Sequence, residues 1–153
     1  MREVKLLIPI SLFMLASCGG NTQESNSTME SETMETMAET ARVFFQNLNN
    51  GDTVTSPVHV EFGVEGMEIM PAGEIVEGTG HHHIIIDGSP VAKDVVVPAD
   101  STHIHFGKGQ TAAEVPLSPG THTLTMQFAN GIHQSYGEDM SATVSVYVES
   151  TMP

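Results

Sequence analysis

The chain has 153 residues, of which 19 are acidic and 5 are basic, and its formal net charge is −14 at pH 7. A surface this negative repels phosphate backbones, which argues against nucleic-acid binding, and it also argues against a polybasic contact with anionic lipid. The single cysteine, Cys18, excludes an intrachain disulfide, so the stability of the fold depends on an apolar core.

Residues 1–17 have the pattern of a secretory signal peptide. Arg2 and Lys5 precede an apolar run that ends at residue 16, and this run is shorter than the roughly 20 residues that span a bilayer. Residues 15–18 read Leu-Ala-Ser-Cys and resemble the lipobox of bacterial lipoproteins, whose cysteine is acylated after cleavage. We expect the mature chain to begin at Cys18 and to be attached by lipid to a membrane of the bacterial cell envelope. Gly19 takes the place of the aspartate that retains such proteins in the inner membrane, which favours the outer membrane.

The segment 18–40 follows this motif and is predicted to be a disordered acidic tether. After Cys18 it contains no aromatic or aliphatic branched residue, so it cannot bury enough apolar surface to fold. Met29, Met34 and Met37 offer thioethers that suit Cu(I), but a low-complexity spacer is the preferred interpretation of this segment.

From residue 41 to residue 150 the sequence predicts one domain of short strands separated by Gly, Pro, Asn and Asp. The predicted strands cover residues 43–45, 58–64, 81–87, 95–97, 102–106, 113–117, 121–129 and 144–148. Residues 66–80 are predicted to form a long loop, and no segment has a helical pattern. Seven or eight strands in about 110 residues predict an all-β fold, an antiparallel immunoglobulin-like β-sandwich.

Histidines are concentrated in two of these predicted strands. Because successive side chains of a strand alternate between its faces, His81 and His83 share one face while His82 points the other way. His103 and His105 likewise share a face. If the two strands are neighbours, three or four imidazoles converge, and imidazole is a common ligand of zinc and copper. The sequence therefore predicts a site for copper or zinc.

Other residues are predicted to support this site. The predicted imidazole ligands, including one from the polar face of the strand 58–64, are His59, His81, His82, His83, His103 and His105. Met67 and Met70, in the loop before the triple histidine, are candidate soft ligands, although loop or core packing is the more common role of methionine. Asp87 and Glu61 are candidates to orient a ligating imidazole from behind.

The two remaining histidines receive other interpretations. His122 is predicted to pack or to cap its strand, and His133 is predicted to be an exposed loop residue. The acidic composition of the chain is expected to raise the pKa values of the histidines.

Ordered motifs along the domain carry a resemblance to a known family. They include Gly-His-His-His at 80–83, His-Ile-His-Phe-Gly at 103–107, Gly-Gln-Thr at 109–111 and the Pro-Gly-Thr-His-Thr-Leu run at 119–124. Together with Arg-Val-Phe-Phe at 42–45, they are similar to the bacterial domain-of-unknown-function family 4399, which occurs in secreted and lipid-anchored proteins. The resemblance implies an exported β domain, and it implies no established activity.

These observations leave two functions open. The first is a lipid-anchored, non-enzymatic domain that binds copper or zinc through the histidines. The alternative is a structural or interaction module that contacts an envelope protein partner and whose histidines stabilise loops. A metal-dependent enzyme is expected less, because no nucleophile triad order, phosphate-binding loop or zinc-protease helix is found in the sequence.

Overall fold

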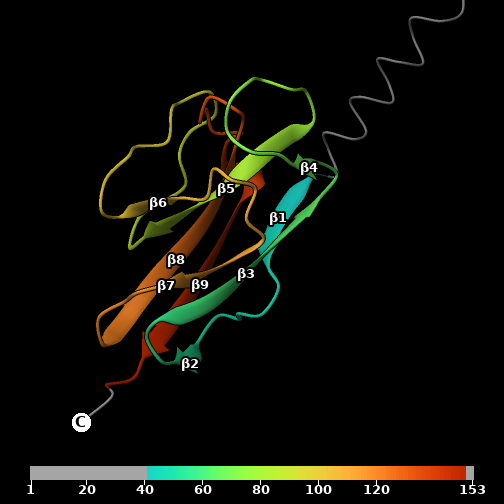
Figure 1. Cartoon of the computed structure of the whole chain (residues 1–153). Helices are drawn as coiled ribbons and strands as arrows, with labels where there is room; N and C mark the ends of the chain where they lie inside the picture. Colours follow the sequence, from blue (N-terminus) through green and yellow to red (C-terminus); the bar gives the residue numbers. More distant parts are fainter. Residues whose placement is uncertain (1–40, 151–153) are drawn as a thin grey trace, which may run out of the picture.

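A computed structural model describes residues 41–150 of the chain (Figure 1). The predicted signal peptide, Cys18 and the predicted tether lie outside the described residues. Within the described range, no helix is long and apolar enough to cross a membrane.

Residues 41–150 form nine strands and a single turn of 3-10 helix, which confirms the all-β prediction. The elements are β1 (Arg42–Phe45), β2 (Asp52–Val54), β3 (Val58–Glu65), β4 (Glu68–Ile69), β5 (Thr79–Ile86), β6 (His103–His105), β7 (Ala112–Val115), β8 (Gly120–Ala129), η1 (Glu138–Met140) and β9 (Ser141–Val148). The main strands lie where alternating apolar residues predict them.

The strands form two sheets that pack face to face as a sandwich. The smaller sheet has the order β1-β3-β7, and the larger has the order β2-β9-β8-β5-β4, with β6 also paired to β5. In Figure 1 the long strands β5, β8 and β9 run side by side behind β1 and β3. The pairs β5–β8 and β8–β9 are antiparallel. Strand β5 is an interior strand, because it pairs with β8 along one edge and with β4 and β6 along the other.

The hydrophobic core lies between the two sheets. Val60 and Phe62 of β3 face Ile84 of β5 and Phe128 of β8, and all four side chains are almost completely buried. Apolar residues at alternate positions of a strand project from the same face. The period-two pattern of the sequence therefore produces the faces that pack against each other in the core.

The outer face of the larger sheet is also covered, and this coverage was not expected from the sequence. The connections after β5 and β8 cross it: Gln127 of β8 donates to the carbonyl of Gly137 and accepts from the amide of Val91. The amide of Val97 donates to the carbonyl of His133, which joins the two connections to each other. Consequently β5 is buried on both of its faces from Thr79 to Ile85.

Three local expectations differ from the structure. Residues 95–97 form an isolated bridge, Val96 to Gln134, instead of a strand, because no longer partner runs beside them. The predicted loop 66–80 contains β4, which pairs in parallel with the start of β5. Residues 52–54 form β2, which pairs in parallel with the end of β9, so the sandwich is not wholly antiparallel.

Candidate metal centre

Strand β5 supplies the first two imidazoles of the site. His81 and His83 project from its outer face, whereas His82 projects into the core between Phe62 and Phe128, with ring centroids 5.1 and 4.9 Å away. The alternation of side chains along a strand separates the three neighbouring histidines in this way. All three side chains are buried because β5 is covered on both faces.

Strand β6 supplies the third imidazole. It pairs antiparallel with β5 in a register that sets His105 opposite His83, which places both side chains on the outer face. Phe106, the next residue, points the other way and packs on Phe62 in the core, with ring centroids 4.8 Å apart. A β-carbon on Gly107 would collide with the ring of His105, so glycine at this position leaves room for the imidazole.

The connection after β8 supplies the fourth imidazole, from His133. The backbone of His133 has a φ of 70°, a left-handed conformation, and its amide donates to the carbonyl of Asn130 at 2.9 Å. The side-chain oxygen of Asn130 accepts from the amides of Ile132 and Gln134, which fixes this turn. The turn directs His133 back over the outer face of the sheet.

A short segment after β4 forms backbone hydrogen bonds with the residues that follow β6 and with the turn that follows β8. The amide of Ala72 donates to the carbonyl of Gly107 at 2.9 Å, and the amide of Gly73 donates to the carbonyl of Gly131 at 2.8 Å. These two bonds link the residues just after His105 to the residues just before His133. The positions of the two imidazoles are therefore coupled through the backbone.

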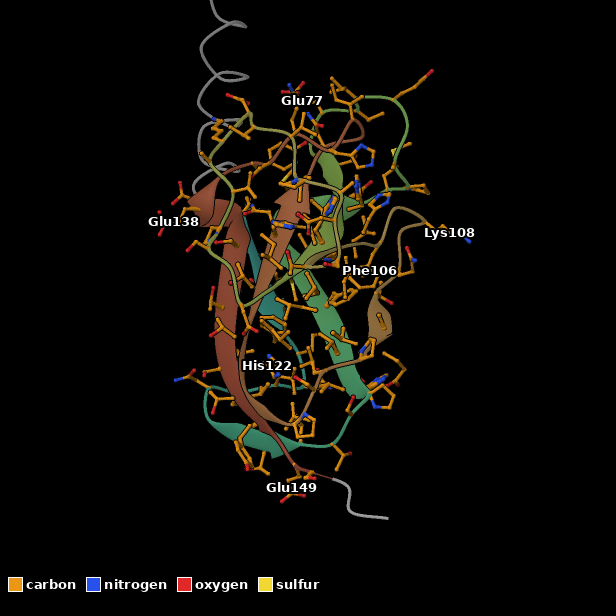
Figure 2. The ribbon with its side chains drawn as sticks, turned by 90° about the vertical axis from the view of Figure 1, so that its left-hand side faces the viewer. Glu77, Phe106, Lys108, His122, Glu138 and Glu149 are labelled. Carbon is orange, nitrogen blue, oxygen red and sulfur yellow. The ribbon has the colours of Figure 1, made fainter. Side chains whose placement is uncertain are left out.

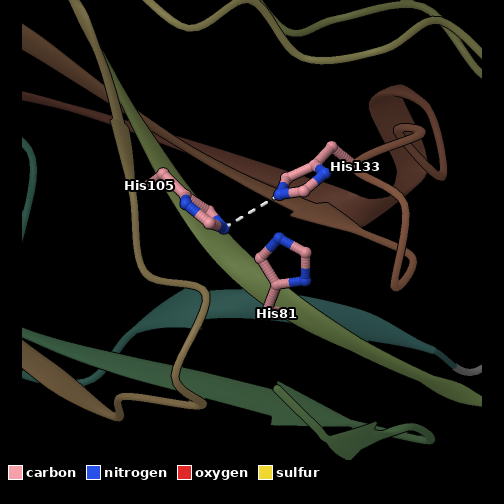
Figure 3. Close-up of side chains that lie close together, drawn as sticks. All are labelled: His81, His105 and His133. Carbon is pink, nitrogen blue, oxygen red and sulfur yellow. Dashed lines mark hydrogen bonds between the residues drawn. The ribbon is translucent and has the colours of Figure 1, made fainter. Parts of the chain in front are cut away.

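The imidazoles converge on one point of the outer face. Figure 3 shows His81, His105 and His133 directed toward one another, and one ring nitrogen from each lies within 4.8 Å of the others. The Nε2 atoms of His105 and His133 are 3.1 Å apart, and those of His81 and His83 are 3.0 Å apart. Each of these two contacts is a hydrogen bond in which one ring nitrogen donates and the other accepts, and the spacing of His105 and His133 is also compatible with two ligands of one ion.

The protonation of the cluster favours metal binding. Burial, followed by repulsion from neighbouring imidazoles, lowers the pKa of His81 to about 4 and that of His83 to about 3. The pKa of His105 is lowered for the same reasons. The expectation that acidic surroundings raise these pKa values is therefore wrong for this cluster, because desolvation is the largest effect. Neutral imidazole is the form that binds a metal.

Some buried nitrogens of β5 have no hydrogen-bond partner. They are Nδ1 of His81, Nδ1 of His83 and both ring nitrogens of His82. Buried polar atoms are normally paired, so these nitrogens are exceptions; in the outward-facing pair of β5 it is the Nε2 atoms, and not the Nδ1 atoms, that contact each other.

Three of the predicted histidine ligands lie away from the cluster. His82 is in the core, as described, and the prediction of it as a ligand does not fit this placement. His59 lies on β3, on the other sheet, where its Nδ1 is 2.8 Å from a carboxylate oxygen of Glu114. His103 lies opposite Ile85, and its Nδ1 is 2.8 Å from Asp100.

The predicted supporting residues also have other contacts. Glu61 lies near His59 on β3, with 3.4 Å between the carboxylate oxygen and Nε2. Asp87 accepts from the amide of Thr123 and lies 2.8 Å from Nδ1 of His122. Figure 2 shows His122 in the lower half of the sandwich, whereas Phe106, beside His105, lies in the upper half.

The two methionines contribute no contact to the cluster. Met67 packs against the core, and the sulfur of Met70 accepts from the hydroxyl of Thr79 at 3.7 Å. The prediction of these two residues as soft ligands is therefore not matched by their placement.

The sequence prediction missed His133. It lies outside the two histidine-rich strands, in a connection whose path no local pattern reveals. The nearest signal in the sequence is its own environment, Asn-Gly-Ile-His at 130–133, in which Asn and Gly predict a turn. The end of β8 lies beside the start of β5, because Ala129 is opposite His81. A turn directly after β8 therefore keeps the chain, and with it His133, near the start of β5.

The fold and the cluster together define a class of protein: a β-sandwich domain whose covered outer sheet face holds several neutral imidazoles suited to a transition metal. A family model described as Domain of unknown function (DUF4399) matches residues 60–149, more than half of the chain, and the chain belongs to this family. The matched region contains all four histidines of the cluster. No curated protein sequence is significantly similar to the chain.

Proposed function

We propose that this domain binds a transition metal ion, copper or zinc, through His81, His105 and His133. The observation that carries the proposal is the convergence of three imidazoles from three separate elements, with ligand atoms within 4.8 Å of one another. Strand periodicity alone does not produce this arrangement, because His105 and His133 belong to elements that only the fold brings next to β5.

The proposed role is binding and not catalysis. Within residues 41–150, carboxylates contact the imidazoles of His59, His103 and His122, and none contacts an imidazole of the cluster. A metal-dependent hydrolase needs a general base beside the ion as well as an open coordination position. The side chains that the cluster imidazoles contact through their nitrogens are other imidazoles, which supports a binding role.

The proposed location is the bacterial cell envelope, at the outer membrane, with Cys18 as the lipid attachment point. Support comes from the sequence of residues 1–18, since two or more acyl chains hold a protein stably at a membrane. Palmitate labelling of the whole chain in a bacterial host tests this part. Label on the parent but not on Cys18→Ala is expected, and equal labelling of both chains would refute the anchor.

Metal binding is tested by calorimetric titration of the whole, untagged chain with Zn²⁺ and Cu²⁺, together with elemental analysis of the purified protein. We expect one equivalent to bind in the parent. The double variant His105→Ala/His133→Ala should lose this binding while it remains folded, because these two side chains are not buried in the core.

A matched control separates the site from general histidine content. The double variant His59→Ala/His122→Ala removes two histidines outside the cluster and should bind metal like the parent. Equal binding by the cluster variant and the parent would overturn the proposal. If neither binds and the cluster variant unfolds at lower temperature, the histidines stabilise loops, as the alternative interpretation of the sequence predicts.

A further inference from the structure

A second group of polar side chains lies away from the histidine cluster, where β5 ends and β8 begins. It consists of Asp87, directly after β5, Ser118, in the connection from β7 to β8, and His122, near the start of β8. The pairing of β5 with β8 sets Ile86 opposite Leu124, which brings Asp87 and His122 to the same end of the sheet. Figure 2 shows His122 in the lower half of the sandwich.

The imidazole of His122 connects the other two side chains. Its Nδ1 atom is 2.8 Å from Oδ2 of Asp87, and its Nε2 atom is 3.1 Å from Oγ of Ser118. The other carboxylate oxygen of Asp87, Oδ1, accepts from the amide of Thr123 at 2.8 Å. Contacts from carboxylate to imidazole to hydroxyl, in this order, are the arrangement that activates a serine nucleophile.

The charge on Asp87 decides which nitrogen of His122 carries the proton. The hydrogen bond from the amide of Thr123, followed by the contact with His122, lowers the pKa of Asp87, so the carboxylate is ionised at neutral pH. Nδ1 of the neutral imidazole therefore donates to Asp87, and Nε2 presents its lone pair to the hydroxyl of Ser118. Nε2 is also 3.1 Å from the carbonyl oxygen of Ser118, which accepts once Nε2 has taken a proton. Both features suit a general base.

The nucleophile is open to solvent. Ser118 and Asp87 are exposed and His122 is half-buried, so an ester reaches Oγ without any movement of the chain. The formal net charge of −14 repels anionic esters and favours uncharged ones. Because Pro119 follows Ser118, the residue after the nucleophile has no N–H to stabilise an oxyanion, and esters with good leaving groups should therefore react best.

The order of these residues along the chain explains why no triad was found in the sequence. The carboxylate comes first, then the serine and then the histidine, and this order matches none of the common triads. A triad is defined by geometry and by the role of each group, and the order in the chain does not enter that definition.

We propose that Asp87, His122 and Ser118 form an acyl-transfer site that hydrolyses small, uncharged, activated carboxylic esters. Oγ of Ser118 attacks the carbonyl carbon while its proton passes to Nε2 of His122, and Asp87 holds the ring in place. The bond to the alcohol then breaks, and His122 returns the proton to the departing oxygen. Water attacks the acyl-serine by the same route, which releases the carboxylic acid and restores the serine.

Two measurements on the whole chain test this site: hydrolysis of para-nitrophenyl acetate and covalent labelling by a fluorophosphonate. In the labelling reaction, Oγ forms a bond to phosphorus, and fluoride leaves together with the serine proton. We expect label on Ser118 by peptide mass spectrometry. The hydrolysis rate should fall at least about tenfold in Ser118→Ala and in His122→Ala. Ser101→Ala is the matched control, since Ser101 is also an exposed serine between strands, and it should react like the parent.

A further variant, Asp87→Asn, tests the positioning role of the carboxylate. Because Asp87 does not touch the ester, kcat should fall while KM is unchanged, whereas a purely structural role would change the unfolding midpoint alone.

Two results would overturn the proposed acyl-transfer site. One is the absence of label on Ser118. The other is hydrolysis that persists in Ser118→Ala and is lost in His105→Ala/His133→Ala, because imidazoles themselves cleave activated esters and the reaction would then belong to the histidine cluster.

Discussion

The Nε2 atoms of His105 and His133 lie 3.1 Å apart, although the two residues are separated by 28 positions and belong to different elements. One projects from an edge strand and the other from a turn after β8, and the backbone bonds of Ala72 and Gly73 link their neighbours. This arrangement depends on the tertiary structure. Because neither His105 nor His133 is buried, these two residues are the best place to test the site without disturbing the core.

Replacement of His133 is expected to weaken metal binding without unfolding the domain. His133→Ala removes one ligand from a half-buried position in a turn whose backbone bonds come from Asn130. We expect metal affinity to fall by at least about tenfold while the thermal unfolding midpoint without metal changes little. Calorimetric titration and circular dichroism measure the two quantities. An unchanged affinity would remove His133 from the site.

Gly107→Ala is expected to act on the site indirectly. The added β-carbon would collide with the ring of His105, an exposed side chain whose Nε2 is hydrogen-bonded to Nε2 of His133. Metal affinity should therefore fall as His105 leaves the cluster, while stability is nearly unchanged because no core contact is lost. A double variant with His105→Ala provides the control: the glycine substitution should add no further loss once the imidazole is absent.

Metal affinity is expected to persist in mildly acidic solution. Burial lowers the pKa of His81 to about 4 and also lowers that of His105, so protons compete less for these two nitrogens near pH 5.5 than for exposed imidazoles. Chelator competition at about pH 7.5 and about pH 5.5 should give affinities that differ by less than about a hundredfold. A steeper loss, like that of a flexible exposed histidine tag, would show that the imidazoles are not preorganised.

His82→Leu is expected to stabilise the domain. Both ring nitrogens of His82 are buried without a partner between Phe62 and Phe128, and an unsatisfied polar group costs about 1–3 kcal/mol. Urea unfolding at neutral pH measures the gain. Lower stability of the variant would instead mean that a bound water or ion pairs with His82.

The same substitution should reduce acid sensitivity. Burial lowers the pKa of His82 to about 4, compared with about 6.5 in an unfolded chain. The unfolded state therefore binds the proton first, and the stability associated with neutral His82 is present above about pH 6.5 and is lost as pH falls toward 4. The advantage of His82→Leu over the parent should grow across this interval, in unfolding experiments with a chelator present.

Asp87→Asn is expected to lower stability and leave metal binding unchanged. Asp87 has a φ of 55°, which asparagine tolerates, and it accepts from the amide of Thr123 while it contacts His122 at 2.8 Å. The contact with His122 is lost or weakened in the amide, at a cost of about 1 kcal/mol, since the carboxylate is half-exposed and screened by solvent. Weaker metal binding in this variant would show that Asp87 supports the site after all.

Most of the fold was predictable, because the pattern that marks each strand depends on residues that are close together in the sequence. Alternation of Val58, Val60 and Phe62 marks the face of β3 that enters the core, and the same period separates His82 from His81 and His83. The short parallel strands β2 and β4 were missed, because three or two residues carry too weak a pattern and their partners are distant in sequence.

The candidate site was predictable only in part. Strand periodicity placed His81, His83 and His105 on shared faces, and their convergence required β5 and β6 to be neighbours, which the structure confirms. The prediction could not distinguish His103 from His105, because they share a face. Asp100 contacts the imidazole of His103 at the start of β6, whereas the pairing of β6 with β5 places His105 opposite His83.

By itself, the sequence determined which residues alternate, where the chain turns and that β5 carries imidazoles on both faces, since these properties depend on neighbours along the chain. The tertiary structure decided that His133 joins the cluster and that His59 and His103 do not. It also decided that burial lowers the pKa values of His81, His83 and His105. Such properties depend on which distant segments share a surface and on how much solvent they exclude, and packing fixes both of these only in the folded chain.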